Sequence, residues 1–360
     1  MMTPVSIGVV GVGHRGQRYA NAFGGLRNCE VKWFCDTDAE SCEAAKRFAG
    51  ATATATRSLE TVLADESLDA VVITTPLAER GDQARSALAS DKHVLVDGPL
   101  SMAADDIVDL TTYARGRALC LLISNRQIFD PALRKLKESV ETGRLGEMLY
   151  LYGNSQGLET VGGDGDTLSS PGARDVAALL YLLDDTPVTV SACGESYLRR
   201  GSPDVTFCYL RFANGVTAHL HLSRLDPQTV RRLTLVGTRQ MAVYNHDAAM
   251  RELTLFAHSI PPMRGNGSGV GATIQLGEAL SPVVRPVDTV MLECESFLAA
   301  VRKGRPLEAE ARLAVNVASV LDALRDSLAL GGAAQPVAPP VTQLRNVVAF
   351  RRVPSPLPAT

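Results

Sequence analysis

Short apolar runs and amphipathic stretches alternate along the first 124 residues. The apolar runs predict buried strands at 5–10, 30–35, 70–74, 93–96 and 119–124. Between them, spacing typical of helices occurs at 17–23, 39–49, 59–64, 81–90 and 105–115. Strands that alternate with helices form right-handed βαβ units, so this part of the chain predicts a mostly parallel sheet covered by helices.

After residue 125 the pattern changes. We expect a helix at 132–142, a strand at 145–153, a Gly- and Ser-rich loop at 155–172 and a helix at 175–183 that Asp175 caps. Alternating runs predict an antiparallel sheet, with strands at 188–197, 205–212, 216–223, 231–237 and 240–244. The hairpin signal Ala213-Asn214-Gly215 joins two of them. Residues 261–271 are expected to form a mobile surface loop, and helices follow at 290–302 and 311–328.

The most informative motif, Gly11-x-Gly13-x-x-Gly16, follows the first predicted strand. The first glycine permits a tight turn, the second lets the backbone approach a pyrophosphate, and the third lets the next helix pack closely on the strand. The second strand ends in Asp36, twenty residues past Gly16, where a carboxylate accepts the ribose hydroxyls of NAD. A glycine turn without a ligand is the alternative, but the strand and helix around the motif favour a dinucleotide.

The residues after Asp36 favour NAD over NADP. Thr37, a further candidate cofactor contact, and Asp38 follow, and no Lys or Arg occurs before Lys46. Two carboxylates at this position would repel the 2′-phosphate of NADP. NAD is therefore the predicted cofactor, with NADP as the less favoured alternative.

Further candidate site residues follow from the same topology, because ligands of parallel sheets bind beyond the carboxyl ends of the strands. The residues expected to rim this crevice are Gly11, Asp36, Thr75, Pro76, Asp97, Gly98 and Asn125. His14 and Arg15 occupy the free positions of the glycine turn, where Arg15 either touches the pyrophosphate or faces solvent. Arg126 either grips the cofactor or an anionic substrate, or forms a salt bridge with Asp130.

The predicted fold is an α/β fold with two domains. Residues 1–124 would form a Rossmann dinucleotide-binding domain, and residues 125–345 an α+β domain with an open, mostly antiparallel sheet for substrate binding and oligomerisation. Residues 346–360 would be a tail with a frayed, Pro-rich end.

Composition narrows the possible partners. The 360 residues are 46% hydrophobic and 21% charged, with a net charge of −3, which is ordinary for a globular protein and makes nucleic acid an unexpected partner. No apolar run reaches the roughly 18 residues of a membrane span, so no membrane association is expected. Seven cysteines without tight spacing favour a reducing compartment, and hence the cytoplasm. No metal site is predicted, since the Cys and His spacings match no zinc pattern.

Several segments, in order along nearly the whole chain, carry a family resemblance. They are the glycine motif, 69–76 (DAVVITTP), 92–99 (KHVLVDGP), 125–126 (NR), 142–146 (TGRLG), 212–215 (FANG) and 295–304 (ESFLAAVRKG). Together they resemble the glucose–fructose oxidoreductase/inositol dehydrogenase/MocA (Gfo/Idh/MocA) superfamily. The resemblance implies a small-molecule substrate, with hydride transfer between a nicotinamide and a sugar, a cyclitol or a related carbonyl compound. It also implies a homodimer or homotetramer joined through the C-terminal sheet.

The resemblance breaks at the family's acid/base positions. Where the family usually has Glu-Lys-Pro, this chain has Asp97-Gly98-Pro99, and Gly98 has no side chain to manage a proton. The family's histidine position is occupied by Arg174, and a family aspartate by Ser170. Arg174 stays protonated near neutral pH, so we expect it to polarise the substrate oxygen with help from a Ser170 hydrogen bond.

Two functions remain open at this point. The first is an NAD-dependent oxidoreductase with altered catalytic residues. The second is a dinucleotide-binding protein without dehydrogenase activity, either a sensor or a catalyst of a non-redox step.

Overall fold

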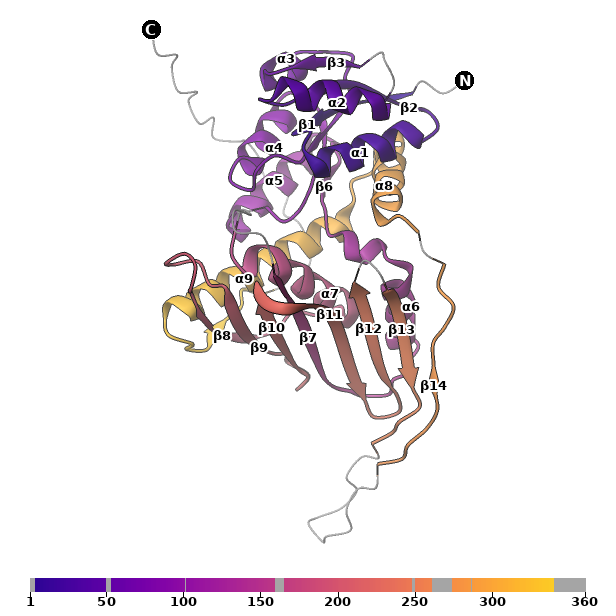
Figure 1. Cartoon of the computed structure of the whole chain (residues 1–360), viewed down its shortest axis with the longest axis vertical. Helices are drawn as coiled ribbons and strands as arrows, with labels where there is room; N and C mark the ends of the chain where they lie inside the picture. The colour runs from indigo at the N-terminus through magenta and orange to yellow at the C-terminus, as the bar shows by residue number, and fades with distance from the viewer. Residues whose placement is uncertain are drawn as a thin grey trace.

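Two sheets, one parallel and one mostly antiparallel, lie one above the other along the long axis of the molecule (Figure 1). The computed structural model describes residues 4–49, 53–100, 102–158, 165–247, 250–260, 274–285 and 287–339. The predicted loop at 261–271 and tail at 346–360 lie outside these ranges. Among the described residues, no helix is long and apolar enough to cross a membrane.

The N-terminal sheet is parallel and has the strand order β3-β2-β1-β4-β5-β6, which is the order of a dinucleotide-binding Rossmann domain. Its strands are β1 (Val5–Val10), β2 (Cys29–Cys35), β3 (Thr54–Thr56), β4 (Ala70–Ile73), β5 (His93–Val96) and β6 (Leu121–Ile123). Its helices are α1 (His14–Gly25), α2 (Ala39–Ala49), α3 (Leu59–Leu63), α4 (Arg80–Ala89) and α5 (Ala104–Gly116). All six residues of β1 are buried, as expected for a central strand covered on both faces. The predicted Rossmann domain is confirmed.

The second sheet has nine strands in the order β14-β13-β12-β11-β7-β10-β9-β8-β15. The strands are β7 (Met148–Leu158), β8 (Thr189–Glu195), β9 (Val205–Arg211), β10 (Thr217–Ser223), β11 (Leu225–Gly237), β12 (Met241–Asp247), β13 (Met250–Phe256), β14 (Ala279–Leu280) and β15 (Gln335–Pro336). Neighbouring strands are antiparallel except β7 and β10, which run parallel. The predicted mostly antiparallel sheet is therefore confirmed, and β13 is a strand that the sequence pattern did not predict.

The predicted loop at 155–172 is wrong at both ends. β7 continues to Leu158, and a single π-helical turn, η2 (Leu168–Gly172), leads directly into α7 (Ala173–Leu183). The small residues at the start of the predicted loop fit a closely covered strand: Ser155 is buried, and a Cβ at Gly157 would lie 3.3 Å from Thr229 Oγ1. Steric fit within the sheet, rather than flexibility, accounts for the small residues.

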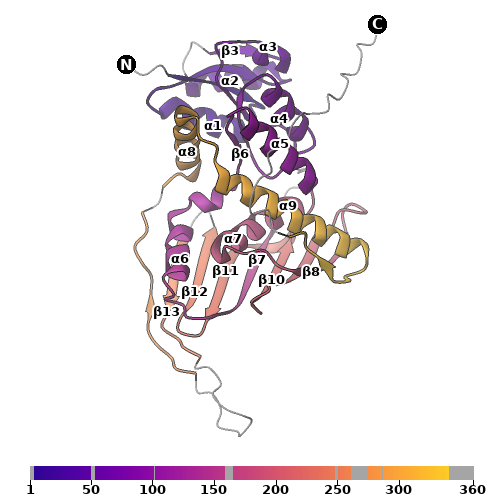
Figure 2. The same ribbon diagram turned by 180° about the vertical axis from the view of Figure 1, so that it is seen from behind.

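Helices cover one face of this sheet and leave the other open. In Figure 2, which views the molecule from behind, α7 and α9 (Glu308–Ala329) lie in front of the strands, and α6 (Pro131–Glu141) lies beside β12 and β13. The short turn η1 (Arg126–Phe129) connects β6 to α6. The buried core of the domain lies between these helices and the sheet.

The last two helices bind the domains together. α8 (Thr289–Lys303) follows the second sheet in sequence but packs beside α1 (Figure 1), where Val290, Cys294 and Phe297 join the core of the Rossmann domain. α9 contributes Val315 to a second core of that domain and Val320 to the core under the antiparallel sheet. The range predicted for the second domain, 125–345, thus contains a helix that belongs to the first by its packing.

Candidate active site

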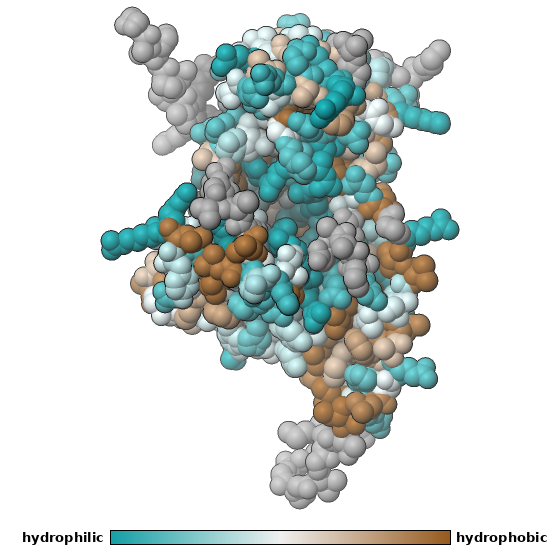
Figure 3. Space-filling view, viewed as in Figure 1, coloured by the Kyte–Doolittle hydropathy of each residue, from teal (hydrophilic) through white to brown (hydrophobic). Residues whose placement is uncertain are grey.

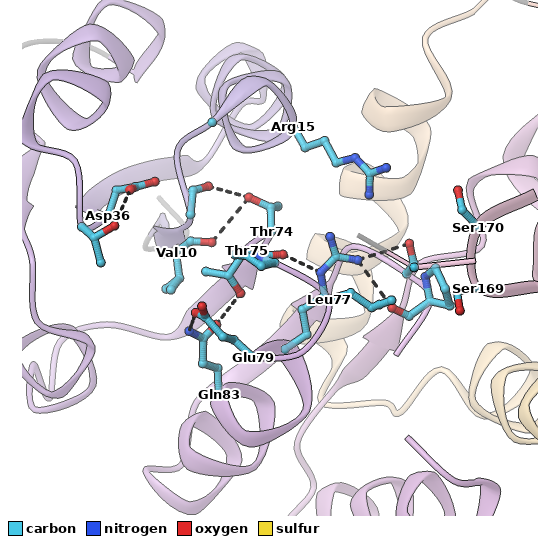
Figure 4. A pocket seen from close by; sticks show the side chains of 18 of the residues that line it. Val10, Arg15, Asp36, Thr74, Thr75, Leu77, Glu79, Gln83, Ser169 and Ser170 are labelled. Atoms are coloured by element: carbon cyan, nitrogen blue, oxygen red, sulfur yellow. Dashed lines mark hydrogen bonds between the residues drawn. The ribbon is translucent and has the colours of Figure 1, made fainter. Parts of the chain in front are cut away.

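A cavity of about 900 Å³ lies between the two domains at the carboxyl edge of the parallel sheet. Eleven of the predicted site residues line it: Gly11, Gly13, Arg15, Asp36, Thr37, Thr75, Pro76, Gly98, Arg126, Ser170 and Arg174. Figure 4 shows Asp36 at one end, Ser170 at the other, and Arg15 reaching from α1 toward Ser170. One continuous space therefore joins the predicted cofactor residues to the predicted catalytic residues.

The glycine turn has the geometry that a dinucleotide requires. Gly11 has φ +82°, and a Cβ there would lie 2.7 Å from the backbone nitrogen of Thr75. A Cβ at Gly16 would overlap the carbonyl oxygen of Gly11. At Gly13 a Cβ would meet nothing within 4 Å, so the backbone of Gly13 is open toward the N-terminus of α1. Only Gly13 therefore leaves room at the position where the motif accepts a pyrophosphate.

Asp36 lies at the end of β2, where its carboxylate is fixed by the backbone. One oxygen accepts a hydrogen bond from Val12 N at 2.6 Å, and the other from Asp38 N at 3.0 Å. Arg57 lines the same end of the cavity. Sequence reasoning missed Arg57 because it looked for a Lys or Arg only in the residues directly after Asp36. Arg57 instead follows β3.

Asp97 was predicted to rim the crevice. It lies instead buried beneath the cavity wall and does not line the cavity. Its carboxylate accepts a hydrogen bond from Arg15 at 2.7 Å. Arg80 and Arg126 each approach it to 3.6 Å, so three arginines from separate elements surround one carboxylate. Arg126 pairs with Asp97 rather than with the predicted Asp130, and because it also lines the cavity its contact with the cofactor or an anionic substrate stays a prediction. Asp130 caps α6 by accepting from Ala132 N.

Three other predicted residues, His14, Gly16 and Asn125, are also absent from the described lining of the cavity. Gly16 lies where the helix meets the glycine turn, as described above. His14 is exposed as the first residue of α1, and Asn125 directly precedes η1. A cofactor role for these residues is a prediction that the geometry leaves untested.

Gly98 is closed off by its surroundings. A Cβ at this position would overlap the carbonyl oxygen of Ser124, which directly follows β6. The lysine expected from the family resemblance is therefore excluded by backbone packing as well as absent from the sequence.

Below Asp97 lies a buried polar cluster that sequence reasoning missed. Tyr19 donates a hydrogen bond to Glu293 of α8 at 2.8 Å, and its hydroxyl is 3.4 Å from both Asp97 and Ser124. Burial raises the pKa of Glu293 to about 7, although Ser124, Tyr19 and Arg126 oppose the shift. A glutamate within an amphipathic helix gives no sequence signal for this contact.

The C-terminal domain supplies the other wall of the cavity. Ser169 and Ser170 of η2 and Arg174 of α7 line it together with Asp166. Asp166 and Ser169 were not predicted, because the sequence suggested an irregular loop here. Ser169 donates to Asp166 Oδ1 from both its backbone nitrogen and its hydroxyl, each at 2.7 Å.

The predicted cap by Asp175 is wrong. Because η2 precedes α7, the helical segment begins before Asp175, which lies inside it and is buried. Burial raises the pKa of Asp175 to about 6, and its Oδ1 is 3.9 Å from His246 Nε2. In the part of the chain that the structure describes, no group of three metal-binding side chains forms a metal site.

Comparison with known proteins agrees with this geometry. Residues 5–124 match an oxidoreductase family with an NAD-binding Rossmann fold, and residues 133–243 match the Gfo/Idh/MocA C-terminal domain. The chain belongs to the Gfo/Idh/MocA family of oxidoreductases, as its motifs suggested.

Individual relatives are distant. A UDP-N-acetylglucosamine 3-dehydrogenase from Acidithiobacillus ferrooxidans is 26% identical over 85% of this chain and 91% of that protein. Its solved structure has a TM-score of 0.77 at 23% identity, covering 92% of this chain and 99% of that chain. A scyllo-inositol 2-dehydrogenase from Bacillus subtilis is also 26% identical, but the match spans only 46% of this chain and 52% of that protein. Levoglucosan dehydrogenase in complex with NADH has a TM-score of 0.79 at 16% identity, covering 94% of this chain and 100% of that chain.

The packing of Gly98 predicts that the family lysine cannot be restored by mutation. Gly98→Lys and Gly98→Ala should each lower the free energy of unfolding by about 1–3 kcal/mol, because the new Cβ forces the backbone away from Ser124. Urea denaturation measures this. Gly116→Ala, at the end of α5 where a Cβ meets nothing within 4 Å, is the control and should not destabilise the protein. Unchanged stability of both Gly98 variants would contradict the packing argument.

The buried Glu293 predicts a pH-dependent stability. Its pKa is raised from about 4.5 in the unfolded chain to about 7 in the folded protein. As pH rises between these values, Glu293 ionises more readily in the unfolded chain, so the folded protein loses stability. Glu293→Gln does not ionise and should melt at least about 2 °C above wild type at pH 8, with little difference near pH 4.5. Glu295→Gln, an exposed change on the same helix, is the control in melts followed by circular dichroism. An equal Tm difference for Glu293→Gln at both pH values would contradict the prediction.

Proposed function

We propose that the protein is an NAD-dependent oxidoreductase that transfers a hydride between the nicotinamide and a sugar-like or polyfunctional hydroxyl or carbonyl compound. The observation that carries the proposal is the single cavity that runs from the glycine turn and Asp36 to Ser170 and Arg174. Family membership, and relatives named as sugar and inositol dehydrogenases, support the same reaction class.

The described residues fit a dinucleotide. Gly13 leaves room for the pyrophosphate at the start of α1, and Arg15, which is paired with Asp97, lines the same cavity. Asp36 would accept the adenosine ribose hydroxyls. When bound, the cofactor supplies the hydride acceptor or donor at its nicotinamide ring.

The preference for NAD over NADP rests on the fixed carboxylate of Asp36. Arg57 at the same end is the group that a 2′-phosphate would contact, so it opposes this preference. Solved structures of similar fold hold NADH in one case and NADP in another, so the fold alone does not decide between them. We propose NAD because the Asp36 carboxylate lies at the end of β2, where the ribose is expected.

At the substrate end, Arg174 would polarise the reacting oxygen and Ser170 would donate a hydrogen bond to it. A guanidinium stabilises negative charge on oxygen without giving up its proton. Polar groups thus converge on the place where a hydroxyl or carbonyl would sit, as expected for a sugar or cyclitol.

One observation favours a second candidate, a dinucleotide-binding protein without dehydrogenase activity. Both family acid/base groups are replaced, and the packing of Gly98 against Ser124 closes the position of the lysine. Such a protein would bind the cofactor without changing its redox state.

A binding and turnover experiment separates the two functions. Wild type should bind NAD in calorimetry, and Asp36→Ala should weaken NAD binding about tenfold or more, because a charge-assisted ribose contact is lost. Absorbance of NADH should then rise with NAD and at least one of scyllo-inositol, levoglucosan, D-xylose or UDP-N-acetylglucosamine. Tight NAD binding without any absorbance change would support the second candidate, and absence of binding would reject both.

We propose further that the protein forms a homodimer or homotetramer through the open face of the antiparallel sheet. Aromatic side chains of neighbouring strands meet there: Phe207 stacks on His221 with ring centres 4.4 Å apart, and Tyr209 lies 5.0 Å from His219. Phe207 is 54% exposed in the single chain. Figure 3 also shows hydrophobic residues on the side of this face where β14 lies. Exposed apolar surface of this kind marks protein contacts.

Light scattering coupled to gel filtration tests this arrangement. Wild type should elute at two or four times the mass of one chain, and Phe207→Glu should shift the mass to that of one chain, because the buried charge would cost several kcal/mol at the interface. Leu330→Glu, an exposed apolar position at the end of α9, is the control and should leave the mass unchanged. A monomeric wild type would overturn the proposal.

A further inference from the structure

Oxidation of an alcohol releases a proton as well as a hydride, and the family groups that handle this proton are replaced here. Gly98 has no side chain, and Arg174 keeps its proton near neutral pH. The site therefore needs another ionisable group within reach of the substrate oxygen.

Among the described residues that line the cavity, three carry carboxylates: Asp36, Glu79 and Asp166. Asp36 lies at the ribose end. Glu79 precedes α4 and accepts a hydrogen bond at 3.1 Å from Gln83, which itself bonds to Thr75. Of the three, Asp166 alone belongs to the wall that also carries Ser170 and Arg174.

Asp166 is fixed in place by short contacts. Its Oδ1 accepts two hydrogen bonds from Ser169, from the backbone nitrogen and from the hydroxyl, both at 2.7 Å. The preceding Gly165 has φ +98°, and a Cβ there would lie 2.9 Å from the Cβ of Ser169. Arg224 donates to the Gly165 carbonyl at 2.7 Å. The turn is therefore built around this pair, since a side chain at Gly165 would push Ser169 away.

The pair also connects the cavity with solvent. The Ser169 side chain lines the cavity although the residue is only 8% exposed, so its hydroxyl has few rotamers available. Asp166 is half-buried. A proton that arrives at the serine has a short hydrogen-bonded path to a carboxylate that exchanges with water.

We propose that Ser169 and Asp166 form the proton-transfer pair of the site, in place of the lysine and histidine of the family. This inference rests on the proposed oxidoreductase function. In the oxidation, the substrate C–H bond breaks with its electron pair, which leaves as hydride to the nicotinamide of NAD, while the O–H bond breaks to leave a carbonyl. Ser169 Oγ takes the hydroxyl proton and passes its own proton to Asp166 Oδ1 along the existing hydrogen bond. Asp166 then releases the proton to water, and reduction runs the same path in reverse.

The division of work among the polar groups follows from their chemistry. A serine hydroxyl alone is a weak base, but it relays a proton when a carboxylate accepts its own. Arg174 stabilises negative charge on the substrate oxygen during the transfer without joining it. The pair and Arg174 thus replace two ionisable family groups with a relay and a fixed charge.

The test uses the full-length protein and whichever of scyllo-inositol, levoglucosan, D-xylose or UDP-N-acetylglucosamine it turns over fastest with NAD. Asp166→Asn keeps an oxygen for the Ser169 hydrogen bonds but accepts no proton, so kcat should fall about 100-fold or more while KM changes little. Ser169→Ala should also lower kcat. Asp326→Asn, at an exposed position of α9, is the control and should keep the wild-type kcat.

Three further readouts separate chemistry from structure. The affinity of Asp166→Asn for NADH, measured by calorimetry, should equal that of wild type. Sodium formate should restore part of the kcat of Asp166→Ala, because a small carboxylate can occupy the space of the lost one, whereas a structural defect would not respond. A pH dye should show rapid proton release during the first turnover of wild type, and this release should disappear in Asp166→Asn.

The outcomes distinguish this inference from the proposed function. Turnover by wild type with an unchanged kcat in Asp166→Asn, or loss of NADH binding together with kcat and no formate rescue, would overturn the proton pair and leave the oxidoreductase intact. NAD binding without turnover by wild type would overturn the oxidoreductase, and the pair with it.

Discussion

The buried carboxylate of Asp97 is the interaction on which the architecture of the site depends. It lies at the end of β5 and forms ion pairs with three arginines: Arg15 of α1, Arg80 at the start of α4 and Arg126 of η1. A buried charge is tolerated only when it is paired, and three guanidiniums tolerate close approach only around an anion. Removal of this one charge would leave the arginines repelling each other at the point where the cofactor side and the substrate side of the cavity meet.

The same region explains why we place proton transfer in the C-terminal domain. Gly98 packs on the carbonyl of Ser124, so the strand ends that hold Asp97 leave no space for a side chain between them. The Rossmann side therefore contributes fixed charges and backbone, which suit a dinucleotide. Side chains able to exchange a proton with a substrate come from the turn before α7, where Asp166 and Ser169 face the cavity. In the proposed reaction, the two domains thus supply different halves of the chemistry.

The sequence predicted the features whose cause is local. The glycine turn, Asp36 and the alternating strands and helices follow from backbone conformation and periodicity, and the structure contains them. Features that depend on contacts between distant segments were missed. Ser155 and Gly157 suggested a loop, although their small size reflects close cover of β7, and Asp166 was hidden in the same stretch. Glu293 has the sequence context of an ordinary helical glutamate, and only the packing of α8 on α1 brings it to Tyr19. Asp175 was assigned as a cap because the π-helical turn before α7 has no sequence signature.

The last two helices determine how the cavity can select a substrate. α8 buries Phe297 in the Rossmann core, and α9 places Val315 in that domain and Val320 in the other. Rotation of one domain against the other would pull either Val315 or Val320 of α9 out of packed surroundings, at about 25 cal/mol for each Å² of apolar surface exposed. Domain closure around a substrate is therefore costly. In the proposed function, selectivity would then rest on the side chains that already line the cavity, including Ser169, Ser170 and Arg174 on its C-terminal wall.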